Sequence, residues 1–389
     1  MADAALERRF GIGRSERSPG DLELELRCLV RVFRAWRGEL RTRFPLPWRR
    51  RVAALRHGFT SMAAVLYRIG ETDPTQYVPD LAFAWRSYKI NGFFNPIAGN
   101  KLVLSQILAG YGIAHPRVLA LVERGRLLAV DDRLTDDRVE ALRRLLAESE
   151  PLVFRPHWSG GGEGVFFLAG GGGEWTINGR PATEPDVLEL VSGLDRYVVT
   201  AFVRQAAYAR EIFPDTTNTI RVLTLWDEGR PFVAAAVHRF GTSRSYPLDN
   251  WHQGRGGLCA AIDVESATLG RSATLDARYR LEWRSRHPET GAAIEGVRIP
   301  RLHPALDEIL RAARCLPGAP CIGWDAVITD DGVSILEANS TPGLYVWQVH
   351  APLLADPRAR RFFHEYGLAG AVRGHRAAEP SAQHPGPPA

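Results

Sequence analysis

Residues 323–343, GWDAVITDDGVSILEANSTPG, place two carboxylates and an amide in a stretch that is otherwise apolar and β-branched. Alternating residues on either side of a short polar segment are typical of a β-hairpin. The segment Asp-Asp-Gly at 330–332 suits a three-residue loop that ends on a glycine with a left-handed backbone. The stretch therefore predicts two antiparallel strands, 322–328 and 333–338, joined by this loop.

The register of the hairpin decides where its acidic side chains lie. With a three-residue loop Thr329 faces Val333, and Asp325 lies opposite Glu337 with the two β-carbons about 5 Å apart. Asn339 follows on the same face two residues later. Two carboxylates this close repel each other unless a cation lies between them, and oxygen ligands of this kind suit Mg²⁺.

The sequence therefore predicts a metal site at Asp325, Glu337 and Asn339. Two alternatives remain open at this point. The acids could face solvent on an edge hairpin, and a two-residue turn would put them on opposite faces of the sheet.

Length and composition describe a globular chain with ample core: 389 residues, 45% hydrophobic and 24% charged. No run approaches the roughly 20 apolar residues of a membrane span. Residues 1–20 lack the apolar segment of a signal peptide. The four cysteines, at 28, 259, 315 and 321, show no metal-ligand spacing, so we expect reduced thiols in a cytoplasmic protein.

The net charge is +5, and only two of the 49 basic residues are lysine, Lys89 and Lys101. A lysine in such an arginine-rich chain is a candidate for a specific role. Arginines are dense over residues 41–58, which could form a surface for nucleic acid or for an anionic membrane. We favour an arginine-decorated helix face, because no nucleic-acid-binding motif accompanies the stretch.

Periodicity predicts helices in the first part of the chain and mixed structure after it. Two helices are expected within residues 21–70, the second over 48–69, followed by one over 101–111 that ends at Gly112. Further helices are expected over 135–149 with Thr135 or Asp136 as the cap, from Thr183, and over 304–316. The expected strands are 151–156, 164–169, 174–180, 196–203, 218–226 and 231–241, the last two as an antiparallel pair. Antiparallel pairs mixed with helices predict an α+β fold.

A glycine-rich segment, SGGGEG at 159–164, separates two of the predicted strands. Such a loop lets backbone N–H groups approach phosphate oxygens. The guanidinium of Arg155, just upstream, would add a positively charged group that can bind phosphate with two N–H donors. The segment is neither a Walker loop nor a dinucleotide fingerprint. By itself it could also be a plain turn.

In chain order these pieces form a set. Lys101 opens a helix, Arg155 precedes the glycine-rich loop, a short strand follows at 197–203, and the acidic hairpin comes last. This order resembles the ATP-grasp superfamily. The motifs NTIRVLTL, HRFG, DNWHQGRGGLCAAID, HPETG, GVRIPRLHP and GWDAVITDDGVSILEAN resemble its sugar-transfer-associated, glutamate-ligase-like group over about residues 90–350.

The resemblance implies an ATP-grasp fold in which two α+β subdomains with antiparallel sheets hold ATP between them. The implied organisation is an N-terminal helical region (1–88), an ATP-grasp domain (89–350) with a glycine-rich-loop subdomain (about 151–203) and a metal-binding subdomain (about 204–350), a C-terminal helix (351–372) and a disordered tail (373–389).

The resemblance also implies roles for individual residues. Lys101 and Arg155 would contact the ATP phosphates, and Arg221, Arg239 and Lys101 would act in catalysis. The implied ATP-binding residues are Lys101, Arg155, Ser159, Gly160, Gly161, Gly162, Gly164, Thr200, Ala201 and Phe202. One or two Mg²⁺ ions would bind Asp325, Glu337 and Asn339, and the substrate would contact Asp249, Asn250, Gly256 and Gly257, although Asp249-Asn250 could also be a simple turn.

The chain departs from the usual ATP-grasp pattern at two positions. Arginine stands at 155 where lysine is usual, and Thr200-Ala201 replaces the acid or glutamine of the hinge strand. Base recognition would then depend on backbone groups.

The implied reaction is ligation of a small-molecule carboxylate to an amine through an acyl phosphate, with release of ADP and phosphate, in polysaccharide or natural-product biosynthesis. Two alternatives stay open: an ATP-grasp phosphotransferase that acts on a hydroxyl, and a non-catalytic nucleotide-binding protein. No nucleic-acid partner is favoured.

Overall fold

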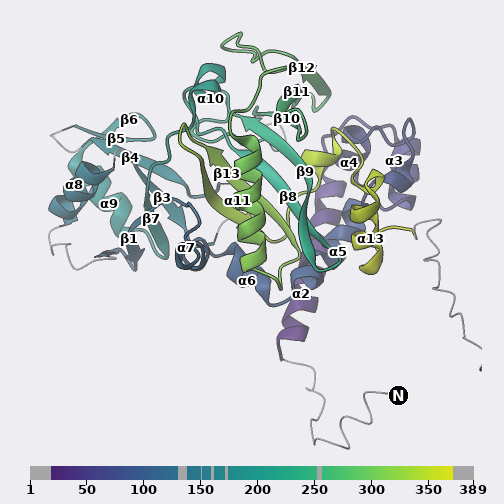
Figure 1. Cartoon of the computed structure of the whole chain (residues 1–389), viewed down its shortest axis with the longest axis horizontal. Coiled ribbons are helices and arrows are strands. Elements are labelled where there is room, and N and C mark those ends of the chain that lie inside the picture. The colour runs from purple at the N-terminus through teal and green to yellow at the C-terminus, as the bar shows by residue number, and fades with distance from the viewer. Residues whose placement is uncertain are drawn as a thin grey trace, which may run out of the picture.

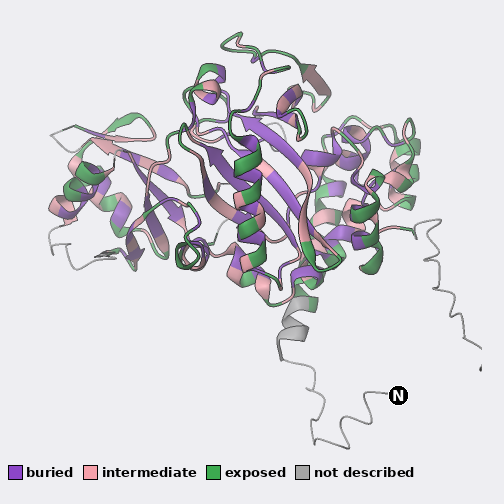
Figure 2. Cartoon of the chain, in the orientation of Figure 1, coloured by how far each residue is buried: buried purple, intermediate pink, exposed green. Residues whose placement is uncertain are grey.

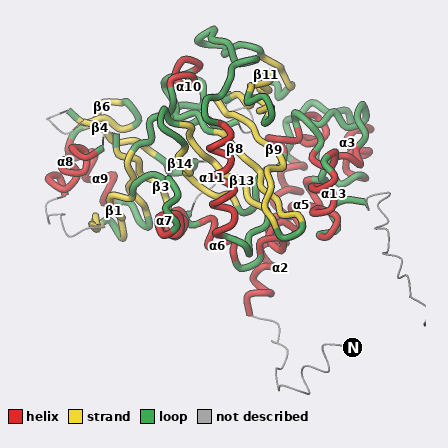
Figure 3. The backbone as a smooth tube through the Cα atoms, viewed as in Figure 1, coloured by secondary structure: helices red, strands yellow, loops and turns green. Residues whose placement is uncertain are grey.

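The computed structural model describes residues 19–129, 138–149, 151–158, 162–170, 174–251 and 256–370. Their fold is α+β, as predicted: two antiparallel sheets lie side by side, with helices at both ends of the molecule and across the larger sheet (Figures 1 and 3). None of the described helices is long and apolar enough to cross a membrane. All four cysteines are free thiols.

The N-terminal region is helical. Its elements are α2 (Pro19–Leu40), α3 (Trp48–Arg56), α4 (Ser61–Leu66), η1 (Pro74–Gln76) and α5 (Asp80–Asn91). The single helix predicted over 48–69 is wrong, because the chain breaks between α3 and α4. Gly58 has a left-handed backbone there (φ +80°), and the Thr60 side chain accepts from Ala63 N at the start of α4.

Two helices lead from this region to the sheets, α6 (Phe94–Gly99) and α7 (Lys101–Gly110). The predicted end of α7 is confirmed, since Gly112 has φ +63° two residues after the last helical residue. At the other end Asn100 accepts hydrogen bonds from Leu102 N and Val103 N, so α7 begins at Lys101.

The smaller sheet has the strand order β2-β1-β7-β3-β4-β5-β6. Its strands are β1 (Val118–Glu123), β2 (Arg126–Ala129), β3 (Leu152–Pro156), β4 (Phe166–Gly170), β5 (Trp175–Ile177), β6 (Arg180–Ala182) and β7 (Tyr197–Ala201). Helices α8 (Arg138–Glu148) and α9 (Glu184–Ser192) pack on it. The sheet begins at Val118, so the expected subdomain of about 151–203 omits its first two strands.

Capping explains where α9 begins. Thr183 accepts from Asp186 N, and the Asp186 carboxylate accepts from Thr183 N in return, which is a capping box at the predicted start. The caps predicted for the preceding helix, Thr135 and Asp136, lie outside the described residues.

The larger sheet has the order β12-β11-β10-β9-β8-β13-β14. Its strands are β8 (Ile220–Asp227), β9 (Arg230–Phe240), β10 (Leu258–Asp263), β11 (Thr268–Leu275), β12 (Leu281–Arg284), β13 (Cys321–Ile328) and β14 (Val333–Asn339). The remaining helices are α10 (Ala207–Ile212), α11 (Leu302–Cys315), α12 (Tyr345–Gln348), η2 (Leu353–Ala355) and α13 (Pro357–Glu365). The expected C-terminal helix, 351–372, is thus only α13 and the turn before it.

Both faces of the larger sheet are buried, as Figure 2 shows for its central strands. Side chains alternate along a strand, so Val222 of β8 packs with α11 while Leu223 packs with the N-terminal helices and α13. The larger sheet is therefore a middle layer that is covered on both faces.

The β13–β14 hairpin differs from the predicted turn in one detail that matters. Ile328 pairs with Val333, so the loop has four residues, and Gly332 does not have a left-handed backbone. The predicted pair of Asp325 with Glu337 is nevertheless confirmed, because a β-bulge at Leu336 shifts the register back. The three-residue loop was therefore wrong, and the facing of the two acids was right.

Candidate active site

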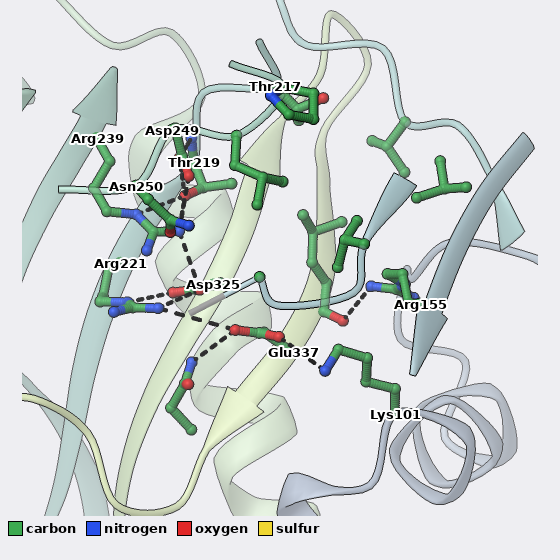
Figure 4. A pocket seen from close by; sticks show the side chains of 18 of the residues that line it. Lys101, Arg155, Thr217, Thr219, Arg221, Arg239, Asp249, Asn250, Asp325 and Glu337 are labelled. Atoms are coloured by element: carbon green, nitrogen blue, oxygen red, sulfur yellow. Dashed lines mark hydrogen bonds and ion pairs between the residues drawn. The ribbon is translucent and has the colours of Figure 1, made fainter. Parts of the chain in front are cut away.

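Three charged residues form a row across adjacent strands of the larger sheet. Asp325 on β13 pairs with Arg221 on β8 and with Glu337 on β14. Arg221 holds Asp325 with two hydrogen bonds, Nε to Oδ1 and Nη2 to Oδ2, each 2.5 Å, and its Nη2 lies 3.9 Å from Glu337 Oε1 (Figure 4). The register of three strands thus brings together residues that lie far apart in the sequence.

Burial and neighbouring charges shift the pKa values of Asp325 and Arg221 in opposite directions. Burial alone would raise the pKa of Asp325, but the charges of Arg221 and Arg239 outweigh it and hold that pKa well below its usual range. Burial likewise opposes the charge on Arg221, and the Asp325 carboxylate raises the pKa of the guanidinium above its ordinary value. Both groups are therefore charged at neutral pH.

Arg239, near the end of β9, belongs to a second network behind the row. Its Nη2 donates to Asp325 Oδ2 (3.1 Å) and to Thr219 Oγ1 (2.5 Å), and lies 3.3 Å from Asp249 Oδ1. Asp249 Oδ2 accepts from the N–H and the hydroxyl of Thr219. Burial raises the pKa of Asp249, an effect that Arg239 opposes.

Lys101 reaches the row from the first turn of α7. Its Nζ lies 3.4 Å from Glu337 Oε2, and only 4% of the residue is exposed. The Lys101 backbone is fixed by an N–H bond to the His157 carbonyl (3.1 Å) and by the Ser105 hydroxyl, which donates to the Lys101 carbonyl (2.8 Å). The lysine singled out in the sequence therefore lies beside the predicted metal ligand.

Arg155 enters from the smaller sheet, on β3. Its Nη1 donates to the carbonyl of Leu336 (3.0 Å), the residue that the bulge leaves without a partner on β13. Among the residues that the structure describes, none accepts from its buried Nε or Nη2. Burial lowers the pKa of Arg155 to about 10, with Glu337 acting against that effect. Two buried donors without an acceptor are costly, and an anionic ligand would satisfy both.

The predicted metal ligands are close together but already engaged. Both oxygens of Asp325 accept from guanidinium groups, and Asn339 Nδ2 donates to Glu337 Oε1 (3.2 Å). Glu337 is the most accessible carboxylate of the row, 23% exposed. No three His, Cys, Asp or Glu side chains of the described residues group in a way that could hold a metal, and this site combines two acids with an amide. The all-oxygen donor set of these three residues fits a hard divalent cation.

These side chains line one cavity of about 510 Å³ between the two sheets. That volume is typical of a small-molecule site. The predicted residues that line it are Lys101, Arg155, Gly162, Thr200, Ala201, Phe202, Arg221, Arg239, Asp249, Asn250, Asp325, Glu337 and Asn339. Ser159, Gly160 and Gly161 lie outside the described residues.

Three predicted glycines are not among the lining residues. Gly164 has φ +76°, and a β-carbon there would meet Pro156 and the Tyr197 hydroxyl. Gly256 has φ +93°, and a β-carbon on Gly257 would meet the Asn250 carbonyl. These glycines permit close backbone packing around the cavity.

The hinge strand β7 offers fewer backbone donors than expected. The N–H of Ala201 bonds to the Arg117 carbonyl (2.9 Å), and that of Phe202 bonds to the Ser149 hydroxyl (3.1 Å). Val203, the next residue, also lines the cavity. Val153, Phe167 and Leu336 give this end of the cavity apolar walls.

Sequence reasoning missed Thr219 and Leu336. Thr219 lies two residues before Arg221 and lines the same cavity, so strand periodicity could have found it. Leu336 could not be found this way, because its role follows from the bulge.

Buried histidines nearby are structural. His238 Nε2 bonds to the Tyr208 hydroxyl (2.8 Å), and burial lowers the pKa of this histidine to about 3. His287, also buried, bonds through its Nε2 to the Gly241 carbonyl (2.8 Å).

Several solved structures resemble the chain at low similarity. They include the ATP-grasp ligase PsnB complexed with minimal precursor (17% identity, 68% of this chain and 60% of that chain, TM-score 0.34). D-alanine–D-alanine ligase from Bacillus anthracis is 14% identical over 68% of this chain and 59% of its own (TM-score 0.32). The ADP complex of purK, N5-carboxyaminoimidazole ribonucleotide synthetase, is 13% identical over 64% and 46% (TM-score 0.36). The chain thus spans about three fifths or less of these proteins.

The search of curated proteins found no match. A family model, in contrast, matches residues 88–361, which is most of the chain and includes both sheets and every residue of the cavity. The chain belongs to the sugar-transfer associated ATP-grasp family.

Proposed function

We propose that this protein is an ATP-dependent carboxylate–amine ligase of the cytoplasm, with residues of about 89–350 as its catalytic unit. The observation that carries the proposal is that two buried nitrogens of Arg155 meet no acceptor among the described residues, in a cavity that Lys101 and Arg221 also line. Cations that converge from separate elements on one cavity are suited to a polyphosphate.

In this proposal Lys101 and Arg155 bind the phosphates of ATP, and Gly162 of the glycine-rich segment lines the same cavity. The apolar walls at Val153, Phe167 and Leu336 receive the base. The hinge at Thr200, Ala201 and Phe202 supplies carbonyl groups, because two of its N–H groups are already bonded within the protein.

Glu337, Asn339 and Asp325 would hold Mg²⁺, which supplies charge neutralisation for the transferred phosphoryl group. Asp325 would exchange an arginine contact to do so, since both its oxygens accept from guanidinium groups. Arg221 and Arg239 would spread the negative charge that develops on the transferred group. Their positions are held by Asp325, Thr219 and Asp249.

The reaction proposed is attack of a substrate carboxylate oxygen on the γ-phosphorus of ATP, with ADP as the leaving group. An amine then attacks the acyl carbon, an amide bond forms, and phosphate leaves. Asp249 and Asn250 also line the cavity and are the proposed contacts for the acceptor. Exclusion of water from the occupied cavity would protect the acyl phosphate.

The test is to incubate the full-length protein with Mg·ATP and pools of amino acids, amino sugars and small carboxylates, and to analyse the products by mass spectrometry. A product that weighs two substrates less one water supports the ligase. With ¹⁸O in the carboxylate, one label should appear in the released phosphate.

Two other outcomes would overturn the proposal. A substrate that gains one phosphoryl group, without a condensed product, would identify a phosphotransferase. ATP binding without product or ADP from any pool would favour the non-catalytic nucleotide-binding protein.

A further inference from the structure

An apolar stripe runs along the outward face of α2, away from the cavity. Its residues recur at spacings of three and four, which places them on one side of the helix. They are Leu26, Leu29, Val30, Phe33, Trp36 and Leu40, with exposed fractions from 41% at Val30 to 82% at Leu40. The opposite side of α2 packs against α5, where Cys28 is fully buried beside Tyr88.

Arginines accompany this stripe. Between residues 26 and 57 the chain carries ten arginines and a single carboxylate, Glu39. Glu39 is buried, accepts from Ser61 N (2.8 Å) and lies 3.5 Å from Arg51 Nε. Within the described ranges no carboxylate lies at ion-pair distance from Arg34, Arg37 or Arg41. The surface around the stripe is therefore rich in positive charge, and Arg34, Arg37 and Arg41 on it have no carboxylate partner among the described residues.

The start of α3 lies next to the end of α2 and also exposes an aromatic and a basic side chain. The ion pair of Arg51 with Glu39 ties α3 to the end of α2. Trp48, the first residue of α3, is 70% exposed, and the Arg49 guanidinium lies 5.5 Å from the centre of its ring. Tryptophan and arginine together are typical of protein surfaces at the boundary between lipid and water.

The apolar stripe and the arginines around it together favour one kind of binding partner over the others. A second copy of the chain on this face would bring two sets of arginines together, which costs energy. Nucleic acid would attract the arginines but would leave Leu29, Phe33 and Leu40 in water. An anionic lipid surface satisfies both features, because apolar side chains enter the headgroup–acyl boundary while guanidinium groups bind lipid phosphates.

We propose that α2 and the start of α3 form a docking surface for an anionic lipid bilayer. The helix lies along the bilayer surface and does not cross it, in agreement with the absence of a spanning helix among the described residues. This surface is separate from the cavity and does not depend on the proposed ligase activity.

The test is flotation of the full-length protein with vesicles of phosphatidylcholine alone or of equal parts phosphatidylcholine and phosphatidylglycerol. We expect flotation with the anionic vesicles only, and a loss of at least about tenfold in binding when salt rises from about 0.05 M to about 0.5 M. Phe33→Glu should abolish flotation, and Arg34→Glu with Arg37→Glu should weaken it strongly.

Tyr111→Glu is the matched control, because Tyr111 is 60% exposed at the end of α7, outside the docking surface. This variant should float like the unaltered protein, and unchanged circular dichroism should show that all variants are folded. Failure to float with anionic vesicles at low salt would overturn the proposal. A dimer that Phe33→Glu converts to a monomer, or binding to nucleic acid in place of vesicles, would overturn it as well.

Discussion

Arg155 carries the clearest information about a ligand at the scale of single residues. None of the described residues accepts from two of its buried nitrogens, and buried donors without an acceptor destabilise the unliganded protein. Arginine rather than lysine at this position adds a planar fork, which can bind two phosphate oxygens at once.

Replacing Arg155 should therefore affect binding and stability in opposite directions. We expect Arg155→Met to weaken ATP binding by about 10- to 100-fold, the loss of one charge-assisted hydrogen bond or more. The unliganded variant should unfold at the same temperature as the original protein or a higher one, because two unpaired donors are removed. Calorimetric titration and thermal unfolding measure the two effects. Arg180→Met, at an exposed arginine of the same sheet, is the control, and equal ATP affinity in both variants would contradict the assignment.

Glu337 is the most accessible carboxylate of the row and lies beside Lys101. We expect Glu337→Gln to lower ATP turnover by at least about a hundredfold, because a neutral amide cannot hold the metal or orient Lys101 as the carboxylate does. ADP release measured against Mg²⁺ concentration should also show a higher metal requirement.

Asp331→Asn is the matched control for Glu337, since Asp331 is an exposed acid in the turn of the same hairpin. It should keep full turnover. Equal activity of the two variants would remove Glu337 from the proposed metal site.

At the scale of elements, the β13–β14 hairpin shows how a correct pairing arose from an incorrect turn. Asp325 faces Glu337 because the bulge at Leu336 compensates for a longer loop. Residues from other parts of the chain bind the bulge. Arg155 donates a hydrogen bond to the Leu336 carbonyl, and Ile335 N donates to the Ala114 carbonyl (2.9 Å). Periodicity alone predicts strands and faces, but such partners come from other parts of the chain.

The junction of α4 and α5 carries a pH-sensitive contact. Thr60 donates to Asp80 through its N–H (2.9 Å) and its hydroxyl (2.5 Å). Burial raises the pKa of Asp80 to about 6, an effect that the Thr60 hydrogen bonds only partly oppose. The pKa of Asp80 is therefore higher in the folded protein than in the unfolded chain. Its contribution to the free energy of unfolding is largest at low pH and is lost as the pH rises through about 6.

We therefore expect the original protein to gain about 1–2 kcal/mol of unfolding free energy relative to Asp80→Asn between about pH 7.5 and about pH 4. Urea unfolding of both proteins at the two pH values measures this difference. Identical pH dependence would show that Asp80 titrates as an ordinary exposed carboxyl.

At the scale of the whole molecule, the cavity draws its residues from both sheets and from α7. The helical region also reaches it, because Arg31 on α2 donates to the Thr341 carbonyl (3.2 Å), just after Asn339. A ligand between the sheets should therefore stabilise the molecule as a unit.

Mg·ATP at about 100 times its dissociation constant should add about 2.7 kcal/mol to the free energy of unfolding. Chelation of Mg²⁺ should remove most of this gain, because the phosphates would then face Glu337 and Asp325 without a neutralising ion. Thermal unfolding with Mg²⁺ alone, ATP alone and both together measures the effect. An equal shift with ATP alone would contradict a metal-dependent site.

The sequence by itself determined the α+β class, most strands, the end of α7 and the start of α9. These features depend on local periodicity, on capping residues and on turns, which act over a few residues. Local patterns did not predict the break between α3 and α4, because it depends on a hydrogen bond from Thr60 N to Asp80, twenty residues further along the chain.

Only the tertiary structure decided which charges meet. Arg221 and Arg239 hold Asp325 from about a hundred residues away, and Lys101 of α7 lies beside Glu337 of β14. Arg155 meets no acceptor among the described residues for two of its donors. The tertiary structure also leaves the apolar side of α2 exposed to solvent. The helical pattern alone would equally suit a helix that faces the core. Sequence spacing encodes the direction of a side chain along its own element, whereas partners and solvent exposure depend on where the other elements pack.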